Sequence, residues 1–363
     1  MSVLGAIAVL AVLIVVHELG HFMAARLQGI HANRFSLGFG PILWKYQGTE
    51  TEYGIRAIPL GGFVGFPDDD PDSDIPPNDP NLLSNRPILD RAIVISAGVI
   101  ANLVFAYVVL VGQLTVQGIP AGLDYQPGVL VPQIVSGDGP AARAGIAAGD
   151  VILSINRQQL GADENAIIKL QTEIQKHPNQ EIPLMVERTD RILTLRVTPE
   201  AGPDGKGRIG VQLYPHGTPI YRAAQNPFEV FRVAAEQFQN IFVRTVQGFG
   251  ELITDFKSVA HQVGGPVKIV EAGAKFAQSD SANLLFFAAF VSINLAILNI
   301  LPLPALDGGQ LVFLLIEGLR GKPLPTKVQE NVMQTGLMLL LGLGVFLIIR
   351  DTTQLEVFQK LLD

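Results

Sequence analysis

The chain has 363 residues, of which 48 % are hydrophobic and 16 % are charged, and its formal net charge is −7. This balance excludes a basic nucleic-acid-binding face and is typical of a protein with membrane-spanning segments. There is no cysteine, and there are only six histidines. Disulfides and thiolate metal sites are therefore excluded, and any metal ligands must come from His, Asp and Glu.

The first segment carries the sequence HELGH inside an apolar stretch. His17 and His21 are four residues apart, so on a helix both imidazoles project from one face and can share a metal. Glu18 lies on the adjoining face, where it can act as a general base toward a water. Residues 3–16 contain no charge, and a Glu and two His in a membrane-length helix are costly. The pattern predicts zinc hydrolysis within a bilayer, rather than a signal peptide or a chance match in a soluble core.

Four segments approach the ~20 apolar residues that a transmembrane helix needs. They are residues 3–25, 92–111, 284–303 and 332–349. The second segment contains Asn102, and the third contains Asn294 and Asn299. We therefore expect four crossings, of which the last serves packing or anchoring.

The loop between the first two crossings contains two β-prone stretches, residues 35–46 and 53–66, with a turn at residues 47–50. Their apolar, glycine-rich sequence predicts a re-entrant hairpin beside the metal site, and a small peripheral sheet fits the pattern equally well. Residues 68–80 follow with many Asp and Pro, and they predict a solvated, flexible loop rather than a calcium site.

Residues from about 120 to 200 change character and predict a soluble module. We expect strands at 128–135 and 150–156, a helix at 163–175, and a hairpin from 182–187 and 192–199. The run GPAARAGIAAGDVILSIN resembles the bacterial PDZ domain, which binds an extended peptide as an added strand and holds its carboxylate in a backbone nest. Residues 125–128 are the expected nest, and a module that only excludes bulky proteins is the alternative. Regularly spaced Phe residues at 228–256 then predict an amphipathic helix at the membrane interface or against this module.

The third crossing ends in the sequence NILPLPALDGG, residues 299–309. Pro302 and Pro304 interrupt the helix, so Asp307 is presented from an unwound turn, and the two following glycines allow close backbone approach. A carboxylate at this depth is destabilised unless it binds a cation. An N-cap role for Asp307 at a helix over 310–317 is an alternative that is compatible with metal binding.

These motifs together resemble the site-2 protease family, peptidase family M50. The resemblance rests on HELGH, the PDZ insertion, Gly265-Pro266 and the run at 299–309, and it extends to residues 34–41, 58–63 and 91–98. It is closer to the bacterial membrane-bound zinc metalloproteases that cleave anti-sigma factors, the regulator of sigma-E protease type. The chain has one PDZ unit where some members have two, and Val99 stands where the family often has Pro.

The resemblance implies a Zn²⁺ ion held by His17, His21 and Asp307 with a water, and Glu18 as catalytic base. It implies an intramembrane zinc endopeptidase that cleaves transmembrane segments of single-pass proteins, such as anti-sigma factors or signal-peptide remnants, after trimming by another protease. A non-catalytic membrane scaffold that presents a PDZ domain and a zinc transporter are the alternatives.

Two asparagines of the third crossing are candidates for substrate binding. The family resemblance implies that Asn299 holds the substrate backbone, and Asn294 is the second candidate. An unwound substrate could pair with the edge of the predicted hairpin, which would satisfy its backbone hydrogen bonds.

The predicted fold is a polytopic α-helical membrane protein with about four transmembrane helices, a re-entrant β-hairpin and an inserted α+β PDZ domain. Its expected parts are residues 1–116, the PDZ domain at 117–200, amphipathic linker helices at 201–280, and the last two crossings at 281–363. Lys and Arg in the first and third loops place the metal-ligand ends on the cytoplasmic side of a bacterial inner membrane and the PDZ domain outside. The expected partners are the lipid bilayer and membrane-protein substrates, without nucleic acid.

Overall fold

The computed structural model describes residues 2–70, 73–135, 137–255, 264–279 and 281–353. The chain divides into a helical unit, residues 1–118 with 224–363, and an inserted unit, residues 119–223. The inserted unit extends beyond residue 200, where the sequence analysis ended it. The reason is that strand β10 (Tyr214–Arg222) pairs with strand β3 (Ile119–Val131) along most of its length.

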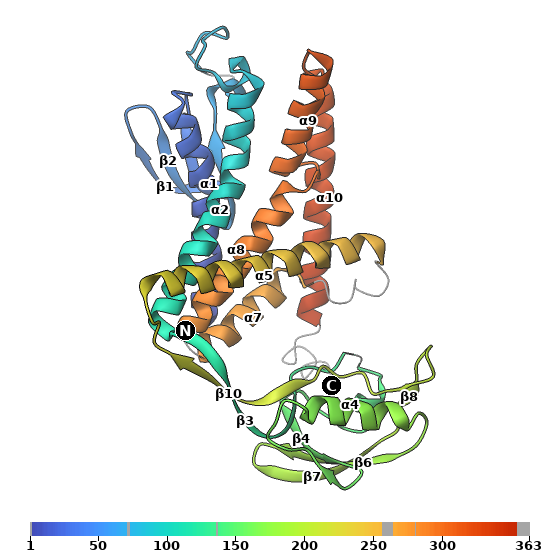
Figure 1. The fold of residues 1–363 in the computed structure, drawn as a ribbon. Coiled ribbons are helices and arrows are strands. Elements are labelled where there is room, and N and C mark those ends of the chain that lie inside the picture. Colours follow the sequence, from blue (N-terminus) through green and yellow to red (C-terminus); the bar gives the residue numbers. More distant parts are fainter. Residues whose placement is uncertain (1, 71–72, 136, 256–263, 280, 354–363) are drawn as a thin grey trace. The chain divides into compact units, whose positions relative to one another are not determined.

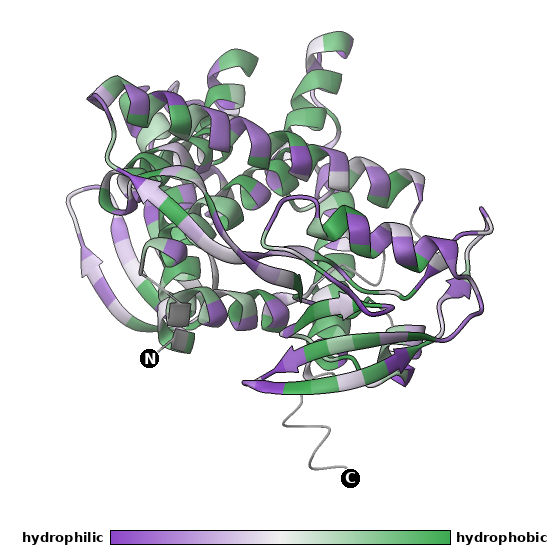
Figure 2. Ribbon diagram, turned by 60° about the horizontal axis from the view of Figure 1, so that its bottom comes forward, coloured by the Kyte–Doolittle hydropathy of each residue, from purple (hydrophilic) through white to green (hydrophobic). Residues whose placement is uncertain are grey.

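Four helices of the described chain are long and apolar enough to cross a membrane, as predicted. They are α1 (Ser2–Leu27), α2 (Ile88–Gln117), α8 (Ser281–Ile300) and α10 (Thr326–Thr353). Hydrophobic residues dominate them (Figure 2), and within the helical unit α1 packs on α2, and α2 packs on α8. The third crossing ends at Ile300 rather than 303, because the chain unwinds before the first proline.

Helix α9 (Asp307–Arg320) continues from α8 after the unwound segment, so the two helices together traverse the helical unit (Figure 1). The loop after α1 and the turn between α9 and α10 then lie at the same end of this unit. Helix α7 (Pro266–Ser279) packs on α1, and its N-terminus is held by Asp351 near the end of α10. The Asp351 carboxylate accepts a hydrogen bond from the Gly265 N–H at 2.8 Å.

Helix α5 (Pro227–Thr254) is amphipathic and packs on α2 (Figure 1). Its N-cap residue is Asn226, whose side chain accepts a hydrogen bond from the Glu229 N–H at 3.0 Å. Its inner face buries Val230 and Ala234. The outer face leaves Phe228 82 % and Phe231 49 % exposed.

Strands β1 (Arg34–Gln47) and β2 (Glu52–Gly65) form a small sheet that has more strand pairings than the predicted hairpin. Residues 34–37 pair in parallel with 52–55 and, on their other side, antiparallel with 62–65. Residues 42–47 pair antiparallel with 52–56 as a hairpin would. Both strands therefore bend in the middle, and positive φ angles at Gly38, Gly40 and Gly61 permit those bends.

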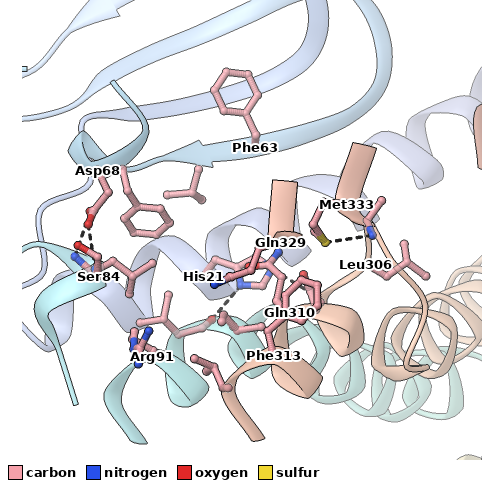
Figure 3. A pocket seen from close by; sticks show the side chains of 18 of the residues that line it. His21, Phe63, Asp68, Ser84, Arg91, Leu306, Gln310, Phe313, Gln329 and Met333 are labelled. Atoms are coloured by element: carbon pink, nitrogen blue, oxygen red, sulfur yellow. Dashed lines mark hydrogen bonds and ion pairs between the residues drawn. The ribbon is translucent and has the colours of Figure 1, made fainter. Parts of the chain in front are cut away.

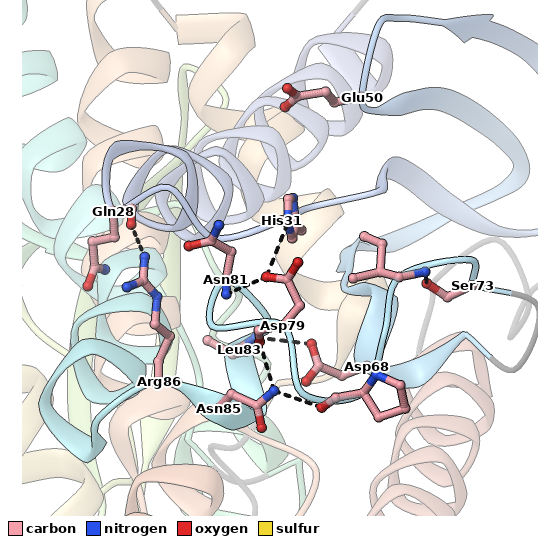
Figure 4. Close-up of polar contacts among 12 residues, drawn as sticks. Gln28, His31, Glu50, Asp68, Ser73, Asp79, Asn81, Leu83, Asn85 and Arg86 are labelled. Carbon is pink, nitrogen blue, oxygen red and sulfur yellow. Dashed lines mark hydrogen bonds and ion pairs between the residues drawn. The ribbon is translucent and has the colours of Figure 1, made fainter.

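Hydrogen bonds link several described residues of the Asp-rich loop between β2 and α2 (Figure 4). Asp68 accepts hydrogen bonds from the backbone N–H groups of Leu83 and Ser84 at 3.1 and 2.9 Å. The Asn85 side chain donates to two loop carbonyls, those of Pro77 and Asp79, each at 2.8 Å. The carboxylates thus satisfy the loop's own backbone, which composition alone does not reveal.

The inserted unit contains a sheet with strand order β10-β3-β4-β6-β7. Strands β4 (Asp150–Ile155), β6 (Ile182–Arg188) and β7 (Arg191–Val197) are antiparallel neighbours, and helix α4 (Ala166–Lys176) buries Leu170 and Ile174 in the same core. These elements follow the sequence prediction closely. The predicted nest at 125–128 is wrong, because these residues lie inside β3, where Tyr125 pairs with Gly217.

Candidate metal centre

Helix α1 presents His17 and His21 on the face that packs against α2 and α9. One helical turn separates them, and their Nε2 atoms lie 3.3 Å apart. Both rings are largely buried, with 11 and 12 % of the side chains exposed. Two imidazole nitrogens that converge at this distance can bind the same ion.

Asp307 is the third member of the cluster and comes from the first residue of α9. Its Oδ2 lies 3.3 Å from His17 Nε2 and 3.5 Å from His21 Nε2. Helix α9 has Leu306 as its N-cap residue, so Asp307 lies inside the first turn and is not the N-cap considered from the sequence. A Cβ on Gly308 would lie 2.1 Å from the Leu301 carbonyl oxygen, so the unwound chain can fold back tightly only because this residue lacks a side chain.

Helix α2 orients the two histidines from the other side. The His21 Nδ1–H donates to the Val94 carbonyl oxygen at 2.9 Å, which leaves Nε2 free to bind an ion. One turn further along, Gly98 provides the space that both imidazoles occupy. After another turn, the Asn102 side-chain nitrogen lies 3.3 Å from His17 Nδ1. The sequence analysis gave no role to these three residues, because their function depends on how α1 and α2 pack.

Glu18 and Asn299 complete the polar groups around the cluster. Glu18 is 9 % exposed, and a Cβ on Gly62 of β2 would lie 2.8 Å from its Cγ, so the sheet packs directly against this side chain. Asn299, near the end of α8, is 8 % exposed, and its Nδ2 lies 3.2 Å from His17 Nε2. The structure therefore brings five of the six predicted site residues together.

Asn294, the sixth predicted residue, lies elsewhere. Its side-chain nitrogen donates to the Phe290 carbonyl oxygen, one turn earlier on α8, at 2.8 Å. It does not belong to the residues that line the cavity around His17 and Glu18. Five residues of spacing on a helix turn Asn294 away from the face that carries Asn299.

A cavity of about 740 Å³ opens onto the cluster. Side chains from the β1–β2 sheet, α1, α2, α9 and α10 converge on it (Figure 3). Apolar groups, including Phe63, line part of its wall, and Arg91, Gln310 and Gln329 line another part. Arg91 of α2 forms an ion pair there with Glu317 of α9. The cavity beside the cluster therefore has both apolar and polar walls.

The donor set fits a zinc ion. Two imidazole nitrogens and one carboxylate oxygen are ligands of catalytic zinc sites, which keep a further position open. Asp307 Oδ2 is buried and lies near the two imidazole Nε2 atoms, but it forms no hydrogen bond within the described part of the chain. A buried carboxylate oxygen without a partner is unfavourable unless a cation neutralises it.

Comparisons with known proteins give a consistent result. The model of peptidase family M50 matches residues 5–343. A protein of Nostoc sp. named "Putative zinc metalloprotease all3971" is 63 % identical over 98 % of this chain and 97 % of its own length. "Membrane metalloprotease ARASP, chloroplastic" of Arabidopsis thaliana is 46 % identical over 99 % of this chain and 81 % of its own length.

Two more distant similarities were also found. "Regulator of sigma-E protease RseP" of Salmonella typhimurium is 28 % identical over 94 % of this chain and 96 % of its own length. Among solved structures, the PDZ domain of an SdrC-like protein from Listeria innocua is 22 % identical with a TM-score of 0.21, and the match covers 24 % of this chain and 96 % of that domain.

Proposed function

Since this chain belongs to peptidase family M50 and is a zinc-dependent membrane metalloendopeptidase, we propose that it hydrolyses peptide bonds inside the transmembrane segments of single-pass proteins. Anti-sigma factors and signal-peptide remnants are the proposed substrate classes. The observation that carries this proposal is the cluster of His17, His21 and Asp307, which lies among helices of membrane-spanning length and opens to a cavity.

His17, His21 and Asp307 are the proposed zinc ligands. Their three ligand atoms lie within 4.8 Å of one another, which supports a shared ion. When bound, zinc supplies a Lewis acid that makes water a better nucleophile near neutral pH and polarises a carbonyl. The burial of all three side chains keeps bulk water from competing with the substrate for this position.

Glu18 is the proposed catalytic base. It is adjacent in sequence to His17 and lines the same cavity, and among the described residues it is not one of the three whose ligand atoms cluster. Its carboxylate accepts a proton from the attacking water and returns it to the nitrogen of the leaving amine. The close packing of Gly62 against the Glu18 side chain restricts its rotamers and keeps the carboxylate near the cluster.

The substrate backbone must unwind, because a helix hides its peptide bonds in internal hydrogen bonds. The segment at residues 62–65 offers a partner. In the described chain it pairs with residues 34–37 on one side only, and Gly62, Phe63 and Val64 line the cavity. An added substrate strand on this segment would keep its amides satisfied beside Glu18. Asn299 contributes a further amide near the scissile bond.

The β1–β2 sheet is proposed to dip into the membrane as a re-entrant element. Its exposed side chains support this, since Leu43 is 71 % exposed, Trp44 54 % and Tyr46 59 %. We place the loops after α1 and after α9, with their Lys and Arg residues, on the cytoplasmic side of a bacterial inner membrane. The absence of native cysteine makes labelling of Lys322→Cys and Asp190→Cys variants from either side of the membrane a direct test of this orientation.

The inserted unit is proposed to act as a PDZ domain that admits only substrates already trimmed by another protease. All proposed zinc ligands and Glu18 belong to the helical unit, so the inserted unit contributes no proposed catalytic group. Its role in this proposal is selection, by size or by binding a newly made carboxyl terminus.

Two variants test the assignment of roles. Glu18→Gln should abolish cleavage of a single-pass substrate while zinc content stays near one per chain, because Glu18 is a base and not a ligand. Asp307→Ala should lose zinc as well as cleavage. The measurements are metal analysis of the purified protein and the cleavage of a tagged substrate in proteoliposomes. Full zinc content and turnover in Asp307→Ala would refute the ligand assignment, and zinc loss in a folded Glu18→Gln variant would refute the role of Glu18.

A further inference from the structure

Asn102 is a buried amide in the middle of a membrane-spanning helix, next to one of the histidines. Its exposed fraction is 0 %, and its side-chain nitrogen lies 3.3 Å from His17 Nδ1. Its Oδ1 is also buried and has no hydrogen-bond partner among the described residues. Such an amide is expensive in a membrane helix, so its retention calls for a function.

Helix α2 places a hydrogen-bonding group next to the Nδ1 atom of each of the two histidines. Val94, Gly98 and Asn102 are four residues apart in succession, so they share one face of α2. Val94 offers a carbonyl oxygen to His21 Nδ1. A carbonyl can only accept, so the proton of neutral His21 is on Nδ1 and the lone pair is on Nε2. His17 needs the same tautomer if its Nε2 is to bind an ion.

We propose that Asn102 is a positioning residue that sets this tautomer of His17. In the ion-binding state its amide is rotated so that Oδ1 accepts the His17 Nδ1–H, and the His17 Nε2 lone pair faces Asp307 and His21. This inference rests on the proposed role of His17 as a zinc ligand. The rotation exchanges two ends of similar shape, so it needs no change in packing, and it gives the unpartnered oxygen a donor.

The backbone of Asn102 is anchored for this task. The Ser292 hydroxyl of α8 donates to the Asn102 carbonyl oxygen at 2.8 Å, and Ser292 is itself 0 % exposed. This hydrogen bond fixes the position of the Asn102 backbone relative to α8, so the Asn102 side chain can rotate without a movement of α2. A hydrogen-bond acceptor held in this way orients the ring toward the ion.

The test uses side chains of similar size and different hydrogen-bonding capacity. Asn102→Asp can accept and should bind zinc at least as tightly as the unchanged protein. Asn102→Leu cannot accept, and its zinc affinity should fall about 10- to 100-fold, as for other ligand-supporting groups. Ser292→Ala removes the anchor but not the acceptor, so its zinc affinity should fall less than that of Asn102→Leu. Zinc affinity is measured by competition with a chelator on the full chain in micelles.

Nitrogen NMR of the histidine rings in the zinc-free protein provides a readout that a merely structural role would not move, because no metal on Nε2 then dictates the tautomer. We expect His17 to carry its proton on Nδ1, and this measurement needs no variant to fold. An unprotonated Nδ1 in that state, or an Asn102→Leu variant with unchanged zinc affinity, would overturn the inference. The His17→Ala variant distinguishes failure of the proposed ligand set from failure of the proposed role of Asn102. If His17→Ala retains zinc, the proposed ligand set is wrong. If His17→Ala loses zinc while Asn102→Leu binds zinc normally, only the proposed role of Asn102 is wrong.

Discussion

Gly98 of α2 lies so close to His21 of α1 that a Cβ on Gly98 would stand 2.3 Å from the His21 Nε2 atom. The same Cβ would lie 2.8 Å from His17 Cε1. The space that the two imidazoles occupy is thus created by a missing side chain on a different helix. Because Nε2 is the proposed ligand atom, this single glycine controls whether both rings can turn toward Asp307.

We predict that Gly98→Ala lowers zinc affinity at least about 100-fold, since one or both rings must leave their positions to relieve the contact. Gly112→Ala is the matched control, because it lies on the same helix and a Cβ there meets nothing within 4 Å. The control should keep zinc and activity, with slightly higher helix stability. Chelator competition and substrate cleavage measure both effects. Normal zinc binding by Gly98→Ala would show that the rings have room that the structure does not provide.

The ion pair between Arg91 and Glu317 joins α2 to α9 inside the cavity, with side chains only 16 and 15 % exposed. We predict that Arg91→Leu or Glu317→Leu destabilises the protein by about 3 kcal/mol, because each leaves a buried charge unpaired. The charge-exchanged double variant should recover a large part of that loss. The exposed pair Arg232–Glu236 on α5 is the control, for which the same changes should cost less than about 1 kcal/mol. Thermal unfolding in micelles, analysed as a double-mutant cycle, measures the coupling between Arg91 and Glu317. Additive losses of stability in the two single variants and the double variant would show that the two side chains are not coupled.

The proposed ligand set could be predicted from the sequence because each part of it is local. The four-residue spacing of His17 and His21 defines a shared helix face, and the prolines before Asp307 announce an unwound turn. The four long helices were equally predictable, since apolar length is a property of one segment. Only the meeting of the N-terminal motif with a residue almost three hundred positions later required the resemblance to a family.

The features that could not be predicted depend on packing between distant segments. Gly98 and Asn102 read as ordinary helix residues until α2 is placed against α1. The strands of the bent β1–β2 sheet have the sequence pattern of a hairpin, and such a pattern does not specify which segments will pair. The Asp68 carboxylate accepts hydrogen bonds from backbone groups fifteen and sixteen residues away, a pairing that the composition of the loop does not predict.

Asp150 of the inserted unit gives a prediction on pH. The carboxylate is 0 % exposed and accepts hydrogen bonds from Arg188 Nε at 2.7 Å and from the Ala147 N–H at 2.8 Å. Burial would raise its pKa, but these hydrogen bonds and the charge of Arg188 outweigh burial and hold the pKa of Asp150 below its ordinary value of 3.8. A carboxyl whose pKa is lower in the folded state stabilises that state fully above its ordinary pKa, and this stabilisation is lost as the pH falls through the folded value.

We therefore predict that the inserted unit keeps its full stability from neutral pH down to about 5 and loses it steeply below about 4. Asp150→Asn should lower its free energy of unfolding by about 2 to 3 kcal/mol at neutral pH and flatten the acid dependence. Asp138→Asn, at an exposed position of the same unit, should change neither property. Hydrogen exchange of β4 and β6 in the full chain reports both quantities. An Asp150→Asn variant with the unchanged acid profile would assign that profile to other groups.

The last prediction concerns the size filter that we propose for the inserted unit. Removing residues 119–223 and joining Gly118 to Ala224 deletes both strands of the β3–β10 pair, whereas a deletion that ends near residue 198 would leave β10 without its partner. The shortened chain retains every proposed zinc ligand, so it should bind zinc with unchanged affinity. It should also cleave a substrate whose large outer domain has not been trimmed, whereas the proposal predicts that the full chain rejects this substrate. The same deletion with Glu18→Gln is the control that attributes any cleavage to this site. A zinc-loaded deletion variant that still rejects untrimmed substrate would exclude gating, and one that cleaves neither form would show instead that the inserted unit is required for docking.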